Sequence, residues 1–217
     1  MTLFARTARR TTPTPAPAGS GCKSLGLKAL FEVLDSGRKH GILDLGSASG
    51  SNVEFLSRYA SKIRVENLYR TLLAQRFFEQ RREEPLQASA FERIVPADGE
   101  EHFDVVLVWD LWNYLRQDEI RALVRYLERL APPGSFLFAI SSTLKEMPSS
   151  PMAFRILDAE TLLYVPESSE MRPCPRYVPR DLALLMPGFR THSSFLLRNG
   201  MQEYLLVRTP EGGSLQK

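Results

Sequence analysis

Residues 41–52 read Gly-Ile-Leu-Asp-Leu-Gly-Ser-Ala-Ser-Gly-Ser-Asn and pass from a short apolar run into a turn of very small residues. The apolar run predicts a buried strand, and a helix is expected to begin at Ser51 or Asn52. Gly46 and Gly50 let the backbone approach a ligand closely, and the free N–H groups of the helix start point at the same place. The segment therefore predicts a nucleotide-type cofactor site at the carboxyl end of the first strand of an open α/β sheet.

The spacing of this turn distinguishes three kinds of ligand. A phosphate-binding P-loop would read Gly-x4-Gly-Lys-Ser/Thr, and no lysine follows Gly50. A dinucleotide fingerprint would read Gly-x-Gly-x-x-Gly, and Ala48 stands at its second glycine. What is present, from Asp44 to Gly50, is Asp-x-Gly-x-Ala-x-Gly. This pattern resembles the first motif of the class I S-adenosylmethionine-dependent methyltransferases, Asp/Glu-x-Gly-x-Gly-x-Gly, with alanine at the central glycine.

The resemblance implies a role for the whole turn. In that family the turn lies against the methionine part of S-adenosylmethionine, and the acid orients the loop. Carried over to this chain, the implied cofactor contacts are Asp44, Gly46, Ser47, Ala48, Gly50 and Asn52. The other interpretation is a structural strand-to-helix turn that binds no ligand.

A second acid supports the nucleoside interpretation. Residues 62–68 predict a strand, and Glu66 lies near its end. In nucleoside-binding α/β folds an acid at this place accepts hydrogen bonds from both ribose hydroxyls, a task that suits the two acceptor oxygens of a carboxylate. Asn67 is a plausible secondary contact, although turn formation explains it equally well.

The strongest strand signal in the chain is the β-branched run from Phe103 to Val108. It resembles the fourth strand of class I methyltransferases, which often begins Phe-Asp-x-Val. Residues directly after that strand face both cofactor and substrate in the family. In this chain they are Trp109, Asp110, Leu111 and Trp112.

The later elements follow the family's order. They are a helix with one apolar face (120–130), a Pro-Pro-Gly turn (132–134), a strand (135–141) and a hairpin around Asn199-Gly200 (193–198 and 202–209). The resemblance implies an α/β fold that is Rossmann-like and doubly wound. Its sheet is expected to be mostly parallel and seven-stranded, with an antiparallel last strand.

Between these landmarks the resemblance is weaker. A helix is expected over 70–82 and a short third strand over 85–88. Family members commonly place an acid after that strand, where it accepts from the adenine amino group, and here Ser89-Ala90-Phe91 occupies the place. Phe91 either stacks on adenine or fills the core, and base rates favour the core.

The segment after the fifth strand is expected to contact the acceptor. A helix is expected over 153–163, a proline-rich loop or lid over 166–179 and a short helix over 180–186. An amino-terminal helix over 23–34 is expected to lie over the cofactor cleft or the sheet edge. Neither this helix nor the segment 145–180 carries a motif that identifies the acceptor.

Length and composition define the expected domain. A chain of 217 residues suits one domain with tails. Residues 1–21 contain no acid and are rich in threonine and proline, which predicts a disordered tail. An organelle-targeting peptide is the alternative, because arginine without acids is its signature. The methyltransferase-like domain is expected over 22–209 and a flexible carboxyl-terminal tail over 210–217.

Composition also excludes several classes of function. The formal charge of +3 is too small to indicate a nucleic-acid partner. No apolar run approaches the ~20 residues that cross a bilayer, and the scattered histidines predict no metal site. Cys22 and Cys174 are best interpreted as free thiols in a reducing compartment. We therefore expect a cytoplasmic protein with no nucleic-acid or membrane partner, and leave its oligomeric state open.

Methyl transfer places few demands on the protein. The site must hold the nucleophile in line with the methyl group and exclude water. A general base is needed only when the acceptor is a poorly ionised oxygen or nitrogen. Asp110 is the best-placed residue for orienting the acceptor or accepting its proton, and a helix-capping acid is the competing interpretation.

Three hypotheses follow from the sequence. The first is S-adenosylmethionine-dependent methyl transfer to a small molecule or a protein side chain. The alternative is a catalytically inactive methyltransferase-like domain that acts as a partner-binding or regulatory subunit. A third hypothesis is another α/β enzyme, such as a nicotinamide oxidoreductase, and both the glycine spacing and the terminal hairpin argue against it.

Overall fold

A computed structural model describes residues 21–34, 37–75, 77–78, 88–98 and 101–210. At its centre lies a sheet with six described strands in the order β10-β11-β5-β4-β2-β3. The strands are β2 (His40–Asp44), β3 (Ala60–Val65), β4 (Val105–Trp109), β5 (Phe136–Ser142), β10 (Phe189–Leu196) and β11 (Met201–Arg208). Strands β2 to β5 run parallel to one another, and β11 runs antiparallel to both of its neighbours.

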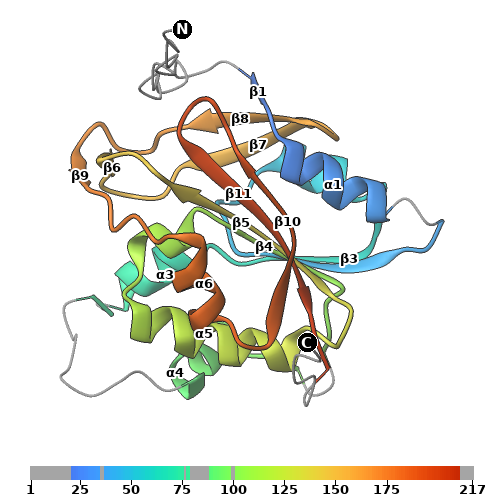
Figure 1. Ribbon diagram of the computed structural model, residues 1–217. Helices are drawn as coiled ribbons and strands as arrows, with labels where there is room; N and C mark the ends of the chain where they lie inside the picture. The colour runs from blue at the N-terminus through green and yellow to red at the C-terminus, as the bar shows by residue number, and fades with distance from the viewer. Residues whose placement is uncertain (1–20, 35–36, 76, 79–87, 99–100, 211–217) are drawn as a thin grey trace, which may run out of the picture.

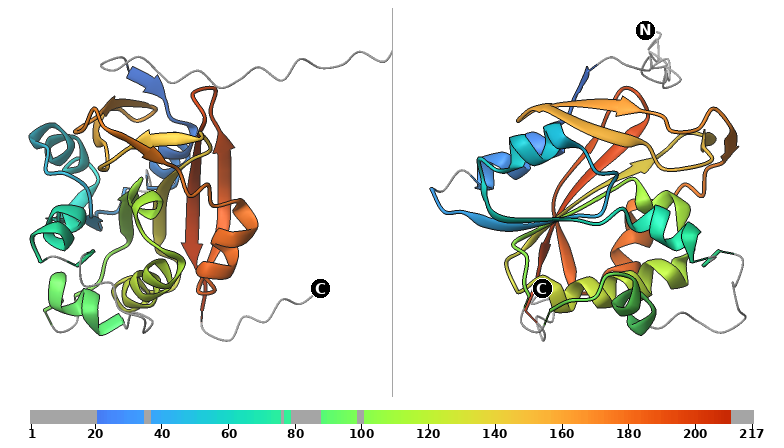
Figure 2. Two further views of the ribbon diagram at one scale, coloured as in Figure 1. Left: turned by 90° about the vertical axis from the view of Figure 1, so that its left-hand side faces the viewer. Right: turned by 180° about the vertical axis from the view of Figure 1, so that it is seen from behind.

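Helices cover both faces of this sheet (Figures 1 and 2). One face carries α1 (Leu25–Leu34) and α2 (Gly50–Leu56), and the other carries α3 (Leu68–Ala74), α4 (Ala88–Ile94), α5 (Gln117–Leu130) and α6 (Pro179–Leu185). Successive strand residues alternate between the two layers: Val105 packs with α1 and α2, and Val106 packs with α3 to α6. The predicted doubly wound α/β architecture is therefore present.

The predicted sheet differs in strand number. Seven strands were expected, and the described part of the chain has six in this sheet. The expected third strand over 85–88 lies mostly outside the described residues, and its last residue, Ala88, begins α4 instead.

Two small antiparallel sheets are formed by the segment after β5, and one of them also includes a strand from the amino-terminal part of the chain. One joins β1 (Gly21–Lys23), β8 (Thr161–Val165) and β7 (Ala153–Asp158), and the other pairs β6 (Glu146–Pro148) with β9 (Met171–Pro173). Phe154 and Ile156 of β7 are buried in the same apolar cluster as α1 and α2. The first small sheet is thereby packed against one face of the domain.

The prediction of a helix over 153–163 is wrong. The chain forms the β7–β8 hairpin there, because buried Phe154 and Ile156 alternate with outward residues at the period of a strand. Leu157, which a helical face would bury, is 53% exposed. The turn is held by Asp158, whose carboxylate accepts from the Glu160 N–H at 2.8 Å.

Several boundaries also move. Gly21, which was expected in the tail, pairs with Leu163 in β1. The helix expected over 70–82 is α3, which ends at Ala74, and residues 79–82 lie outside the described residues. The carboxyl-terminal hairpin is confirmed, with Gly200 at a φ of 81° in its turn.

The amino-terminal helix packs at the β10 edge of the sheet, the second of its two expected places. Helix α1 packs on β5, β10 and β11, and its amino end is held by the buried Glu203, which accepts from the Gly26 N–H at 2.7 Å. No helix in the described ranges is long and apolar enough to cross a bilayer.

Candidate functional site

The glycine turn is anchored by Asp44, at the end of β2. One oxygen of its buried carboxylate accepts from the Gly46 N–H at 2.9 Å and from the Trp109 indole N–H at 2.6 Å. Burial raises the pKa of Asp44 to about 6, although these two hydrogen bonds lower it. The acid therefore orients the loop, as the resemblance implied, and also holds a tryptophan from the neighbouring strand.

Trp109 lies directly against Gly46. A Cβ atom at position 46 would come within 2.5 Å of the Trp109 ring, so only glycine leaves room for the indole. Trp109 ends β4 after an irregularity in the strand register, and its φ is 55°. A positive φ is strained for an aromatic residue, and such strain clusters at functional sites.

The indole is also held from its other side. Phe154 of β7 stacks on Trp109 with ring centroids 5.2 Å apart and an interplanar angle of 6°. Phe154 in turn meets Tyr164 of β8 edge-on at 5.2 Å. Three aromatic rings thus connect the glycine turn to the β7–β8 hairpin.

Two side chains join the turn to neighbouring segments. The Ser47 hydroxyl donates to Glu167 at 2.9 Å, which bridges the turn to the loop after β8. The Asn67 amide donates to the same hydroxyl at 3.3 Å, while its oxygen accepts from the Arg70 N–H and caps α3. Asn67 therefore has a local structural role, as the cap of α3 where turn formation was considered, and it also contacts the glycine turn.

Asn52 has a structural partner in β7. This buried side chain donates to the Phe154 carbonyl and accepts from the Ile156 N–H, both at 2.8 Å. The Asn52 side chain thus forms the two hydrogen bonds to the β7 backbone that a neighbouring strand would form. Asn52 therefore fastens β7 to α2, a task that the sequence did not reveal.

Glu66 follows β3 and is partly exposed. One of its oxygens accepts from the Arg64 guanidinium at 2.9 Å, and Arg64 also pairs with Glu101 at 2.5 Å. Both pairings raise the pKa of Arg64 against the effect of its own burial. Glu66 stands where a ribose acid is expected, and its second oxygen has no hydrogen bond among the described residues.

The remaining predicted contacts separate into two groups. Ala48 and Gly50 are exposed, and a Cβ at Gly50 would meet no described atom within 4 Å. Phe91 is fully buried in the core and lines neither cavity described below. Its core interpretation is correct, and the adenine interpretation lacks support.

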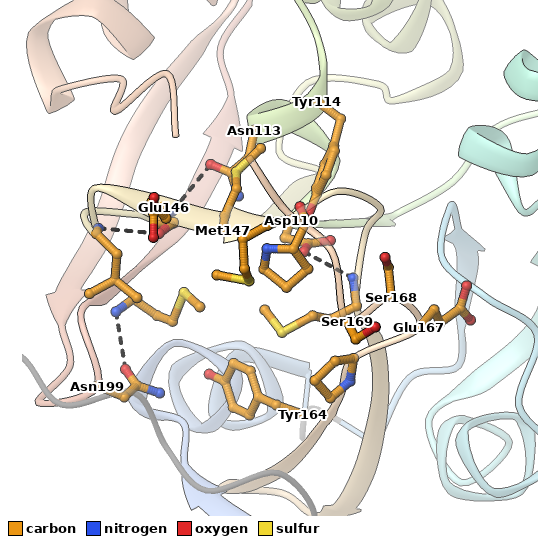
Figure 3. Close-up of a pocket in the computed structure, with 17 residues that line it drawn as sticks. Asp110, Asn113, Tyr114, Glu146, Met147, Tyr164, Glu167, Ser168, Ser169 and Asn199 are labelled. Atoms are coloured by element: carbon orange, nitrogen blue, oxygen red, sulfur yellow. Dashed lines mark hydrogen bonds between the residues drawn. The ribbon is translucent and has the colours of Figure 1, made fainter. Parts of the chain in front are cut away.

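Two cavities meet at the carboxyl ends of β2, β4 and β5. A small recess of about 20 Å³ is bordered by Gly46, Ser47, Asn67 and Trp109. A much larger cavity of about 710 Å³ lies beside it (Figure 3). Asp110, Met152 and Glu167 line both cavities, so the two spaces share one wall.

Asp110 is the most unusual titratable group of this wall. Its side chain is 2% exposed, and its carboxylate accepts from the Met152 N–H at 3.1 Å. Burial raises the pKa of Asp110 to about 7, and the nearby Glu167 carboxylate adds to the rise. The helix-capping interpretation fails, because Asp110 precedes η1 (Leu111–Tyr114) without capping it through its side chain.

Most of the large cavity was not found by sequence reasoning. Its walls come from η1, the end of β5, the two small sheets and the Asn199–Met201 turn. Tyr114 supports one wall, since its hydroxyl donates to the carbonyls of Pro148 and Ser150 at 3.1 and 2.8 Å. Of the expected acceptor segments, 145–180 contributes to the cavity and α1 does not.

Solved structures identify the fold. A S-adenosylmethionine-dependent methyltransferase from Clostridium acetobutylicum superimposes with a TM-score of 0.54 over 85% of this chain and 91% of that chain, at 12% identity. An amino pentose methyltransferase from Micromonospora echinaspora gives 0.49 over 84% and 89% at 12% identity. The N-methyltransferase NodS from Bradyrhizobium japonicum gives 0.48 over 85% and 94% at 12% identity.

The chain therefore has the class I methyltransferase fold, as the glycine turn indicated. No protein-family model and no curated protein matches its sequence. At this identity the likeness concerns the fold, and the function has to be argued from the site.

The polar groups of the site suit S-adenosylmethionine, but the volume of the recess is too small for it. The anchored turn, the open face at Gly50 and a ribose-type acid at Glu66 match the groups of the cofactor. The recess of about 20 Å³ between Gly46 and Trp109 does not hold a molecule of that size. A cofactor placed in this recess would need the Trp109 indole or the Glu167 loop to move.

Proposed function

We propose that this chain transfers the methyl group of S-adenosylmethionine to a small molecule bound in the large cavity. The observation that carries the proposal is the shared wall of the two spaces, where Asp110, Met152 and Glu167 border both. Methyl transfer needs an acceptor and a cofactor held side by side and in line. A cavity of about 710 Å³ beside the anchored turn supports this arrangement.

The residues around the turn would hold the cofactor. Asp44 keeps the loop in shape through Gly46, and Glu66 offers a free carboxylate oxygen to the ribose hydroxyls. Ser47 and Asn67 also border the recess. When bound, S-adenosylmethionine supplies both the methyl group and its own leaving group.

Asp110 would handle the acceptor's proton. It lies on the wall that the two cavities share. Its pKa of about 7 lets it both accept and release a proton at neutral pH. The Met152 N–H fixes the direction of its carboxylate. Met147 and Met152, both buried, help to exclude water from this place.

The test is calorimetric titration with S-adenosylhomocysteine, the product form of the cofactor. Micromolar binding is expected for the wild type. Glu66→Ala should weaken it about tenfold, because a charge-assisted hydrogen-bond acceptor is lost. Glu101→Ala is the matched control: it also removes a partner of Arg64, but Glu101 precedes β4 and does not follow the carboxyl end of a strand as Glu66 does, so affinity should stay within about twofold.

Absence of binding at millimolar S-adenosylhomocysteine or S-adenosylmethionine would contradict the proposal. That result would favour the alternative, a partner-binding or regulatory subunit whose turn stays closed. The contacts of Trp109 and Glu167 with the turn are the observations that keep this alternative worth testing.

A further inference from the structure

The apolar wall of the large cavity is rich in methionine. The chain has six methionines, and four of them line this cavity: Met147, Met152, Met171 and Met201. Methionine side chains are unbranched and polarisable, so they adapt to irregular ligands and contact aromatic rings favourably. This wall suits a flexible or aromatic apolar body.

The charged groups of the cavity carry one sign. Among the described residues that line it, Asp110, Glu146 and Glu167 are the charged side chains, and none is lysine, arginine or histidine. Asp110 is buried and has no ion pair among the described residues. A buried carboxylate without a cation is costly, and a cationic ligand would relieve that cost.

The three carboxylates are not equally placed to contact a ligand in the cavity. In Figure 3, Asp110 lies near the middle of the cavity, while the Glu167 carboxylate points away from its centre. Glu167 is engaged by the Ser47 hydroxyl, and Glu146 is exposed. Asp110 is therefore the carboxylate that a bound cation would meet.

Two tyrosines complete the polar lining. The Tyr164 hydroxyl is buried and lies beside the Asn199 side chain, which lowers the pKa of Tyr164 against the larger effect of burial. Figure 3 shows it directed toward the side chain of Asn199. The Tyr114 ring already attracts one cation on its face, since the Arg172 guanidinium lies 5.5 Å from its centroid. Tyr164 and Asn199 therefore add polar groups to the wall, whereas the face of Tyr114 is already occupied by Arg172.

We propose that the large cavity binds a primary or secondary ammonium ion carried on a flexible apolar or aromatic body, with the ammonium group at Asp110. The identification of this amine as the methyl acceptor rests on the proposed function. The binding itself does not, because every residue that the amine contacts lines the large cavity. Carboxylates and phosphate esters are unsuited, since they would face Asp110, and no lysine, arginine or histidine is among the described residues that line the cavity.

The full-length protein is labelled with carbon-13 at the methionine methyl groups, and the signals of these groups are followed by NMR. Three probes of one shape are titrated without cofactor: 4-phenylbutylamine, 4-phenylbutan-1-ol and 4-phenylbutyrate. The amine should shift the signals of Met147, Met152, Met171 and Met201 and leave that of Met186, which lies in the core, unchanged. Single Met→Leu variants assign the signals with little change in volume.

The amine should bind at least tenfold more tightly than the alcohol, and the butyrate more weakly than both. Asp110→Asn should remove most of the preference for the amine over the alcohol. The order of the three affinities in the wild type tests the inference even if the Asp110→Asn variant does not fold. Equal affinity for all three probes, or shifts of Met186 alone, would overturn the inference.

The two proposals fail in different ways. Amine binding without any binding of S-adenosylhomocysteine would retain this inference and contradict methyl transfer. Binding of S-adenosylhomocysteine with no preference for the amine would retain methyl transfer and overturn this inference.

Discussion

The indole nitrogen of Trp109 donates to Asp44 over 2.6 Å, a contact between residues at the ends of two adjacent parallel strands. This contact fixes the Trp109 ring on Gly46, beside a recess of about 20 Å³. The same acid thus shapes the turn and holds the indole against it. Opening of this contact is the event on which the proposed function depends.

Substitution of Gly46 tests the close approach of Trp109. Gly46→Ala places a Cβ 2.5 Å from the indole ring, and we expect a loss of about 1–3 kcal/mol of unfolding free energy from overpacking. Gly50→Ala is the matched control, since a Cβ there meets open space and should change stability by less than about 0.5 kcal/mol. Urea denaturation measures both, and equal effects would refute the tight contact.

Removal of the Glu167 carboxylate should ease opening. Glu167→Ala breaks the hydrogen bond from Ser47, so the affinity for S-adenosylhomocysteine should rise about two- to fivefold through a shift toward the open state. Glu170→Ala is the control, because that carboxylate lies in the same loop and makes no hydrogen bond or ion pair in the described part of the chain. Calorimetry that finds weaker binding to Glu167→Ala would show that Glu167 helps to hold the ligand.

The raised pKa of Asp110 predicts a pH-dependent stability. Its folded value of about 7 exceeds the ordinary 3.8, so between these values the folded state binds more protons than the unfolded chain. The contribution of Asp110 to stability therefore falls as pH rises through this window and stays low above it. Glu167, Tyr114 and Tyr164 face this group, and none of them neutralises it.

Asp110→Asn should remove that dependence. Near pH 4 the variant and the wild type should have similar unfolding free energies, because Asp110 is then largely protonated. Near pH 8 the variant should be more stable by on the order of 2–4 kcal/mol. Denaturation curves at the two pH values measure this, and a variant less stable than the wild type near pH 8 would mean that the carboxylate has a cationic partner.

Asn52 should hold the β7–β8 hairpin in place. Asn52→Ala leaves the Phe154 carbonyl and the Ile156 N–H without partners, which should cost about 2–4 kcal/mol. Hydrogen exchange of the Ile156 amide should accelerate with it. Ser51→Ala, at the adjacent exposed position, should change neither; unchanged exchange in Asn52→Ala would contradict the fastening role.

Local patterns sufficed to predict the strand, turn and helix around Gly46, because consecutive residues determine all three. The order of the later strands and the terminal hairpin were predicted for the same reason. Local patterns could not predict the contact between Trp109 and Asp44, because 65 positions separate the two residues and only the folded sheet brings them together. Trp109 was predicted to contact the cofactor, and nothing local indicated that it would cover the turn.

The hairpin of β7 and β8 was missed although its signal is present. Phe154 and Ile156 alternate with outward residues, and Asp158 supplies a turn. Counting apolar residues alone gave a helix, because Leu157 was assigned to the buried face. The large cavity could not be predicted at all, since its lining comes from four separate parts of the chain that meet only in the folded domain.

The decisive measurement follows the Met152 methyl signal of the carbon-13-labelled protein while S-adenosylhomocysteine is added. Met152 lines both the recess and the large cavity, and Met186 lines neither. We expect the Met152 signal to move and saturate while the Met186 signal stays in place. An unmoved Met152 signal at millimolar S-adenosylhomocysteine would contradict a cofactor site at the glycine turn, and with it the proposed methyl transfer.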